Sequence, residues 1–344
     1  MAKATFPIVV SASRSTDIPA FYADWFFHRL NQGYSAWTNP FNGVKSYVGY
    51  DDTKFIVFWS KNPRPLLRYL DVLRQKGIGC YVQYTLNDYE EEGLERGVRP
   101  LAERIETFKL LVDQLGKGAV VWRFDPLILT DKIDMDKLLK KIENIGDQLR
   151  NYTEKLVFSF ADIESYKKVK NNLQRSYINY IEWTKPQMIE FANRLVALNK
   201  SKGWNFDLAT CGEIADLDGV QHNHCVDDRL MVRFGNNSPE LLKFLGAEIK
   251  DPNYSDSLFA EFEPVEIPSD AILLDDGRYI VINQNNKDKG QRIACGCMKS
   301  KDIGEYNTCP HLCEYCYANT SKDAAVKNWQ QHKMNPEQDT ITGR

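Results

Sequence analysis

Short apolar runs alternate with longer amphipathic segments along the first two thirds of the chain. The apolar runs are rich in β-branched and aromatic residues, which predicts buried strands. Seven runs have this character: residues 8–10, 34–37, 55–59, 80–87, 119–126, 155–162 and 206–213. Apolar residues at helical spacing between them predict helices at 20–30, 66–75, 101–115, 135–149 and 186–200. Regular alternation of this kind predicts βα units and a parallel sheet.

Seven strands favour a closed or nearly closed barrel over an open sheet. The sequence therefore predicts an α/β fold of the TIM-like (β/α) barrel type, complete, permuted or incomplete, over residues 1–225. The alternation becomes irregular in residues 226–290, although 271–274 and 278–282 read as a hairpin with Asp275-Asp276-Gly277 at its turn. Residues 291–344 form a cysteine-rich tail, expected to pack over the carboxyl ends of the strands.

Composition narrows the class of protein. The chain has 344 residues, of which 43% are hydrophobic and 26% charged, as in a globular protein. Its net charge of -3 gives no general basic field, so charge alone does not indicate a nucleic-acid partner, although a local basic patch stays open. The absence of a signal-like start and of a long apolar run predicts the cytoplasm and no membrane partner. Thiols stay reduced there, which favours metal binding over disulfides.

The densest candidate chemistry is a cysteine cluster near the C-terminus. Five of the eight cysteines lie between residues 295 and 316, and three of them follow the spacing C-x3-C-x2-C: Cys309, Cys313 and Cys316. Thiolates at this spacing bind a soft metal or an iron–sulfur cluster. A structural zinc site is the alternative, with a fourth ligand drawn from Cys295, Cys297 or His311.

The other cysteines suggest a second site. Cys80 lies in a strand pattern and reads as a core thiol. The remaining four could complete an all-cysteine site: Cys211, Cys225, Cys295 and Cys297. In the simpler interpretation Cys211 and Cys225 are unrelated buried thiols. His222 and His224 would be substitute ligands for zinc.

Polar residues gather at the predicted strand ends, where the loops of a parallel barrel form its site. We expect catalytic roles for five of them: Arg14, Asp17, Lys61, Arg123 and Asp125. Cofactor-binding roles are expected for another five: Asn39, Asn62, Gln83, Asn87 and Glu213. Ser159 and Cys211 also lie at predicted strand ends. Each could instead have a local role, such as Asp17 or Asn62 as a helix N-cap and Arg123 in an ion pair with Asp125. Most strand aromatics should be core, among them Trp37, Phe58, Trp59, Tyr84, Trp122 and Phe158.

The segment Cys309-Pro-His-Leu-Cys313-Glu-Tyr-Cys316-Tyr317 resembles the cysteine loop of the radical S-adenosylmethionine (SAM) enzymes. The resemblance implies three cysteines on a [4Fe-4S] cluster, whose open iron binds SAM for one-electron cleavage to a 5′-deoxyadenosyl radical. The chain also resembles an uncharacterised bacterial family with this cluster at its C-terminus, related to the radical SAM superfamily. The matching segments are residues 11–21, 58–63, 83–87, 122–126 and 295–319.

Two features differ from ordinary radical SAM enzymes. Their cysteine loop follows the first barrel strand, whereas here it follows every other predicted strand. The Gly-Gly-Glu-like stretch that usually holds the SAM amino group has only Cys211-Gly212-Glu213 as a counterpart.

We therefore expect a cytoplasmic iron–sulfur enzyme of the radical SAM type, with an unknown substrate and an electron donor such as a ferredoxin or flavodoxin. A [4Fe-4S] cluster is favoured over zinc in the second site as well, because the open site must receive an electron. Two alternatives stay open. One is a zinc- or cluster-stabilised nucleic-acid-binding or repair module, and the other is a barrel hydrolase acting on a phosphorylated ligand through Lys61, Arg123 and Asp125.

Overall fold

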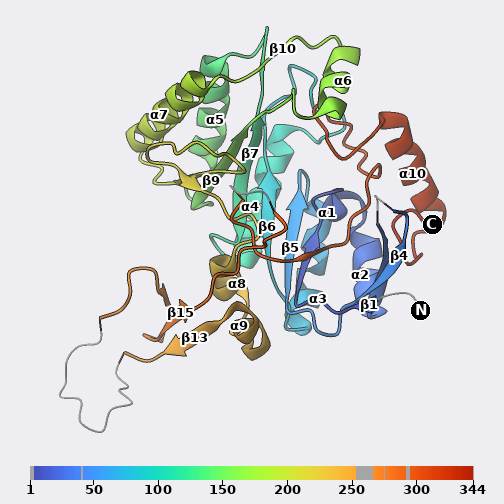
Figure 1. The fold of residues 1–344 in the computed structure, drawn as a ribbon, viewed down its shortest axis with the longest axis vertical. Helices are drawn as coiled ribbons and strands as arrows, with labels where there is room; N and C mark the ends of the chain where they lie inside the picture. Colours follow the sequence, from blue (N-terminus) through green and yellow to red (C-terminus); the bar gives the residue numbers. More distant parts are fainter. Residues whose placement is uncertain (1–3, 40–41, 253–265, 275, 292–294, 344) are drawn as a thin grey trace.

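An eight-stranded parallel sheet forms the centre of the molecule (Figure 1). The computed structural model describes residues 4–39, 42–252, 266–274, 276–291 and 295–343. Every pair of neighbouring strands in the sheet is parallel. From edge to edge the strands are β12 (Gln221–His222), β11 (Asp207–Thr210), β9 (Lys155–Phe160), β7 (Val120–Leu127), β6 (Gly79–Thr85), β5 (Phe55–Ser60), β2 (Val9–Ala12) and β16 (Lys301–Asp302).

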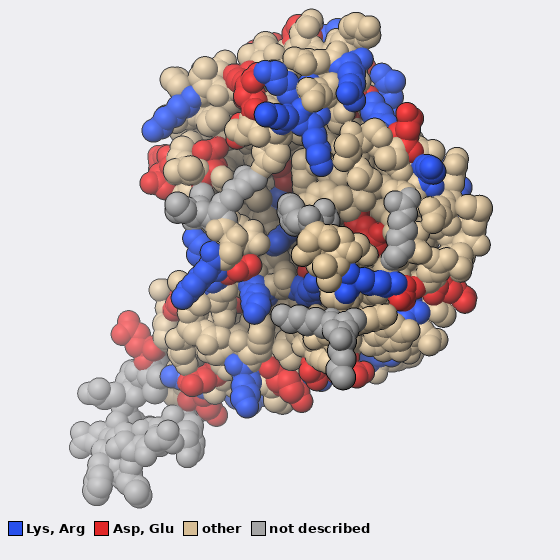
Figure 2. Space-filling model, turned by 45° about the vertical axis from the view of Figure 1, so that its right-hand side comes forward, with Lys and Arg blue, Asp and Glu red and all other residues tan. Residues whose placement is uncertain are grey.

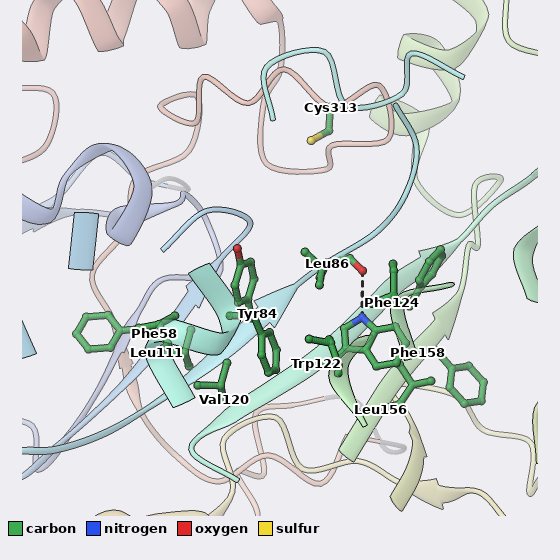
Figure 3. Packing of buried hydrophobic residues seen from close by; sticks show 14 of the residues in the cluster. Phe58, Tyr84, Leu86, Leu111, Val120, Trp122, Phe124, Leu156, Phe158 and Cys313 are labelled. Carbon is green, nitrogen blue, oxygen red and sulfur yellow. Dashed lines mark hydrogen bonds between the residues drawn. The ribbon is translucent and has the colours of Figure 1, made fainter. Parts of the chain in front are cut away.

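Helices and a large apolar core cover one face of this sheet. Phe58, Tyr84, Trp122 and Phe158 point into that core and are fully buried, and Trp122 Nε1 donates to Leu86 O at 3.0 Å (Figure 3). The segments on this side are α1 (Ile18–Phe21), α2 (Ala23–Asn31), η1 (Arg64–Tyr69), α3 (Leu70–Gln75), α4 (Leu101–Leu115), α5 (Met135–Leu149), α6 (Lys167–Arg175) and α7 (Lys185–Lys202). The core prediction holds for these aromatics, while Trp37 and Trp59 are half-buried.

The opposite face is covered by a smaller unit, of which the sequence pattern predicted only the hairpin. Val57, Tyr81 and Val121 on this face form a second core with Met231 and Leu241. The unit consists of α8 (Asp228–Phe234), α9 (Pro239–Leu245) and an antiparallel sheet of β13 (Ala247–Lys250), β15 (Tyr279–Ile282) and β14 (Ile272–Leu273). It projects from the lower end of the main sheet (Figure 1). The predicted hairpin is β14 paired with β15, and Asp275 of its turn lies outside the described residues.

The sheet is open in the described part of the chain, with β12 and β16 as its edges, so the predicted closure into a barrel is not confirmed. The side chains of α8 and α9 pack where a closed barrel would pack its own strands against one another. Placing 34–37 in the main sheet was wrong. β3 (Tyr34–Thr38) instead lies in a three-stranded sheet with β4 (Lys45–Gly49) and β1 (Ala4–Thr5).

The C-terminal tail returns to the N-terminal helices. It contains α10 (Lys322–Met334), which the sequence pattern did not predict. Trp329 of α10 lies against Phe21 and Tyr22, with ring centroids 5.6 and 5.2 Å away. Two short strands, β8 (Leu129–Thr130) and β10 (Tyr180–Ile181), pair with each other outside the main sheet. Among the described helices, none is both long enough and apolar enough to cross a membrane.

Candidate cysteine-rich site at the carboxyl end of the sheet

Cys309, Cys313 and Cys316 lie on one loop, the three-cysteine loop. This loop follows the carboxyl end of β16 in the main sheet. β16 pairs in parallel with β2, and Asp302 accepts hydrogen bonds from Ser13 Oγ at 2.9 Å and from the Arg14 backbone N–H at 2.8 Å. Gly304 fits this junction because a Cβ there would lie 1.8 Å from Ser13 Oγ. The loops after β2 and β16 are therefore held side by side.

Asp17 anchors this loop through His311. Its Oδ2 lies 2.7 Å from His311 Nε2 and accepts the Lys61 backbone N–H at 2.7 Å. Its Oδ1 accepts from Ala20 N at 3.0 Å and from Ser60 Oγ at 2.7 Å, so Asp17 is also the N-cap of α1. The capping alternative for Asp17 is confirmed. The second ring nitrogen of His311 lies 3.3 Å from Gly97 O, so both nitrogens already contact oxygen atoms and His311 is poorly placed as a metal ligand.

Lys61 anchors the loop at a second point through Tyr315. Lys61 Nζ lies 2.7 Å from Glu95 Oε1 and 2.8 Å from the Tyr315 hydroxyl, and Tyr315 also donates to Glu95. Asn87 Nδ2 donates to the Tyr315 hydroxyl at 3.0 Å, and Asn87 Oδ1 accepts from the Asp125 backbone N–H at 2.9 Å. The loop is thus tied directly to the ends of β5 and β6, and through Asn87 to β7.

Glu95 is the central residue of this network, and the sequence pattern did not single it out. It lies in the acidic loop of residues 88–99, yet its side chain is fully buried. Burial alone would raise the pKa of Glu95, but the charges of Lys61 and Arg104 outweigh it and lower this pKa to about 2. Burial raises the pKa of the Cys309, Cys313 and Cys316 thiols, so a metal must displace their protons.

The other four candidate ligands form the four-cysteine group: Cys211, Cys225, Cys295 and Cys297. The Sγ atoms of Cys211 and Cys225 lie 3.2 Å apart. Interactions with the Cys225 and Cys295 thiols, together with burial, raise the pKa of Cys297, so Cys297 is within electrostatic reach of both thiols. Hydrogen bonds with Cys211 and Cys297, reinforced by the charge of Arg123, lower the pKa of Cys225 well below its usual value. All eight cysteines are free thiols, and burial raises the pKa of the isolated Cys80 to about 12.

Arg123 lies beside this group rather than in an open mouth. Arg123 Nη1 donates to Gln83 Oε1 and to Cys225 Sγ, each at 3.1 Å, and Nη2 pairs with Asp125. Gln83 Nε2 donates to Cys225 O at 2.9 Å. The ion-pair alternative for Arg123 and Asp125 is confirmed, and Ser159 donates to the same carboxylate.

Arg14 lies between the two sets of cysteines. Its backbone O accepts a hydrogen bond from Tyr317, next to Cys316, at 2.6 Å. Its guanidinium carbon lies 5.2 Å from the ring centroid of Trp59, and that of Arg123 lies 5.4 Å from the same ring. Burial lowers the pKa of Arg14, but the charges of Cys297, Cys225 and Asp302 outweigh it and raise this pKa above its usual value.

The remaining candidates lie outside these contacts. Asn39 follows β3, which is not part of the main sheet, and its backbone N–H donates to Val44 O at 3.0 Å. Asn62 is not an N-cap, since Pro63 precedes η1. Glu213 accepts from the backbone N–H groups of residues 214 and 215, at 2.9 and 3.2 Å. His222 is exposed and lies 2.8 Å from Asp216, whereas His224 packs against the backbone between Cys295 and Cys297.

The molecule is hollowed on the face drawn in Figure 2, and Lys, Arg, Asp and Glu side chains lie around this hollow. A groove of about 600 Å³ runs beside the four-cysteine group, lined by His224, Arg229, Lys287 and Cys295 among others. Within the described ranges, no three His, Cys, Asp or Glu side chains are already arranged to hold a metal ion.

Fold and site together define an α/β protein with a parallel sheet and two sets of free cysteines at its carboxyl end. The chain belongs to the family described as a domain of unknown function, DUF1848, whose model matches residues 9–318. This confirms membership of an uncharacterised family over nearly the whole chain. Neither the curated proteins nor the solved structures include a match to it.

Proposed function

We propose that the protein is an iron–sulfur enzyme of the radical SAM type, in which Cys309, Cys313 and Cys316 bind a [4Fe-4S] cluster. The position of β16 carries this proposal. In radical SAM enzymes the cysteine loop follows the first barrel strand. Here it follows the last strand in sequence, β16, which lies beside β2 at the edge of the sheet and runs parallel to it. A permuted and incomplete (β/α) barrel, with β16 in the place of the first strand, accounts for both the cysteine spacing and its position in the chain.

The donor set suits such a cluster. Three thiols on one loop leave one iron without a protein ligand, and the nearby His311 is engaged with Asp17 and Gly97. Cys313 and Cys316 both raise the pKa of Cys309, so the three thiols are within electrostatic reach of one another. When bound, the cluster would supply the electron that cleaves S-adenosylmethionine.

The surrounding residues then have separate tasks. Asp17 and Lys61 act as positioning residues, since they hold His311 and Tyr315 of the loop. Asp125 is the charged side chain that would contact a ligand, because its carboxylate is about one-fifth exposed beside Arg123 and Ser159. Such an enzyme would work in the cytoplasm, with a ferredoxin or flavodoxin as electron donor.

A SAM-cleavage assay tests the proposal. Anaerobically purified protein, reduced with dithionite and given SAM, should release 5′-deoxyadenosine, detected by liquid chromatography. Cys313→Ala should abolish release, whereas Cys80→Ala, which removes a buried thiol elsewhere, should retain it. Wild-type protein with a full complement of iron and sulfide but without 5′-deoxyadenosine release would refute the proposal.

A further inference from the structure

We propose that Cys211, Cys225, Cys295 and Cys297 bind a single zinc ion rather than a second iron–sulfur cluster. The inference goes beyond the proposed function and does not depend on the chemistry at the three-cysteine loop. Its first support is the separation of the closest pair of thiols. The Sγ atoms of Cys211 and Cys225 lie 3.2 Å apart.

That separation fits ligands of one ion. Two thiolates on a tetrahedral zinc, with Zn–S bonds of about 2.3 Å, lie roughly 3.8 Å apart. The pair would therefore have to separate by only about 0.6 Å to bind zinc. In a four-iron cluster each cysteine binds a different iron atom, so two ligand sulfurs are separated by two Fe–S bonds and an iron–iron edge. Cys211 and Cys225 would therefore have to move much further apart for that arrangement than for zinc.

The other two thiols lie next to this pair. The Val226 backbone N–H donates to Cys297 Sγ at 3.5 Å, and the Met298 backbone N–H donates to Val226 O at 3.0 Å. These bonds hold the segment of Cys297 alongside Cys225. Cys295 lies two residues before Cys297 in the chain and lines the groove beside the group. Rotation of the Cys295 and Cys297 side chains toward the pair would complete a tetrahedral set.

The surroundings provide the positive charge and the N–H donors that an anionic site needs. Zinc with four thiolates carries a charge of about -2. Arg123 Nη1 and Asn223 Nδ2 each lie 3.1 Å from Cys225 Sγ. Arg14 Nη2 is buried and makes no hydrogen bond to the described residues, and the Arg14 charge interacts with Cys225, Cys295 and Cys297. Thiolates on a metal would satisfy this N–H group, and such outer contacts orient and stabilise metal ligands.

Zinc is the expected metal, because it binds a given divalent-metal site more tightly than Fe²⁺ does. Four protein ligands leave no open position, so the site is structural. It would tie together the end of β11, the loop between β12 and α8, and the segment that leads into β16. The zinc ion would thereby hold β16, and the three-cysteine loop that follows it, on the sheet.

Metal analysis of the full-length triple variant Cys309→Ala/Cys313→Ala/Cys316→Ala tests this directly, since the variant lacks the first site. Purified anaerobically, it should contain about one zinc per chain and no sulfide, and X-ray absorption should show about four sulfurs near 2.3 Å. Adding Cys211→Ala and Cys225→Ala should remove the zinc, while adding Cys80→Ala should not. Retention of about four irons with sulfide, or an absence of bound metal, would overturn the inference.

A second measurement does not rely on these further substitutions folding. Cobalt added to the metal-free triple variant should produce the absorption bands of a tetrahedral thiolate complex, saturating at one equivalent, and zinc should displace it. Absence of these bands would refute the four-thiolate site. The iron and sulfide content of the first site is the content of wild type minus that of the triple variant. Absence of a cluster at the first site would therefore be detected separately from absence of zinc at the second.

Discussion

Replacing Glu95 with Gln probes the buried network that holds the three-cysteine loop. The substitution keeps the shape of the side chain but removes its charge beside Lys61, whose ammonium lies 2.7 Å away. The folded state lowers the pKa of Glu95 from 4.5 to about 2. At about 1.4 kcal/mol per unit, this shift corresponds to a stabilisation of about 3 kcal/mol near neutral pH. Loss of one partner from a buried ion pair costs a similar amount.

The pH dependence distinguishes this electrostatic cost from a packing defect. The pKa of Glu95 is lower in the folded state than in the unfolded state. The carboxylate therefore contributes its full stabilisation above about pH 4.5, and this contribution is lost as the pH falls toward about 2. The difference in free energy of unfolding between wild type and Glu95→Gln should therefore shrink toward zero over this range.

Urea unfolding of reduced, metal-free protein, followed by tryptophan fluorescence, measures this difference without a contribution from metal release in acid. Glu91→Gln is the matched control, because Glu91 belongs to the same acidic loop and its side chain is 77% exposed. It should change the free energy of unfolding by less than about 0.5 kcal/mol. A Glu95→Gln cost below about 1 kcal/mol, or one that does not change with pH, would refute the reasoning.

Three further predictions concern the anchoring of the tail and its thiols. Asp17→Asn should lower the free energy of unfolding by about 2 kcal/mol in thermal unfolding, because the buried Asp17 carboxylate accepts four hydrogen bonds. The matched control is Asp52→Asn, which should have little effect because Asp52 is exposed. Equal effects of the two substitutions would contradict the anchoring role of Asp17. Trp329→Ala should lower the free energy of unfolding in urea by about 2 kcal/mol, since the Trp329 ring packs against Phe21 and Tyr22. An unchanged urea midpoint would show that α10 does not stabilise the fold. Cys80 should resist alkylation by iodoacetamide at neutral pH in the folded protein, because the thiol is buried and burial raises its pKa to about 12. Mass spectrometry measures the alkylation, and rapid modification of Cys80 would contradict its core position.

The sequence pattern located the main βα units well because their apolar runs are long and periodic. The predicted helices at 101–115 and 135–149 coincide with α4 and α5. Hydrophobic periodicity does not report a strand's partner, so β3 was assigned to the wrong sheet. β12 and β16 have two residues each, too few to show a period. The buried residues of α10 include Asn328 and His332, so this helix lacks an apolar stripe.

The candidate site was only partly predictable for a related reason. Spacing alone identified the three-cysteine loop, and cysteine counting grouped Cys211 with Cys225, whose thiols meet in the fold. Glu95 had no such signal, because it lies among several acidic residues that differ from it only in burial. Its role depends on Lys61 and Tyr315, which are distant in sequence and meet it only in the folded protein.

The central claim is tested most directly by measuring iron and acid-labile sulfide. The two samples are anaerobically purified wild type and the triple variant Cys309→Ala/Cys313→Ala/Cys316→Ala. The account predicts about four irons and four sulfides per wild-type chain, all lost in the triple variant, with the broad visible absorbance of the cluster lost in parallel. Wild-type protein without sulfide, or a triple variant that keeps the same iron and sulfide content, would contradict it.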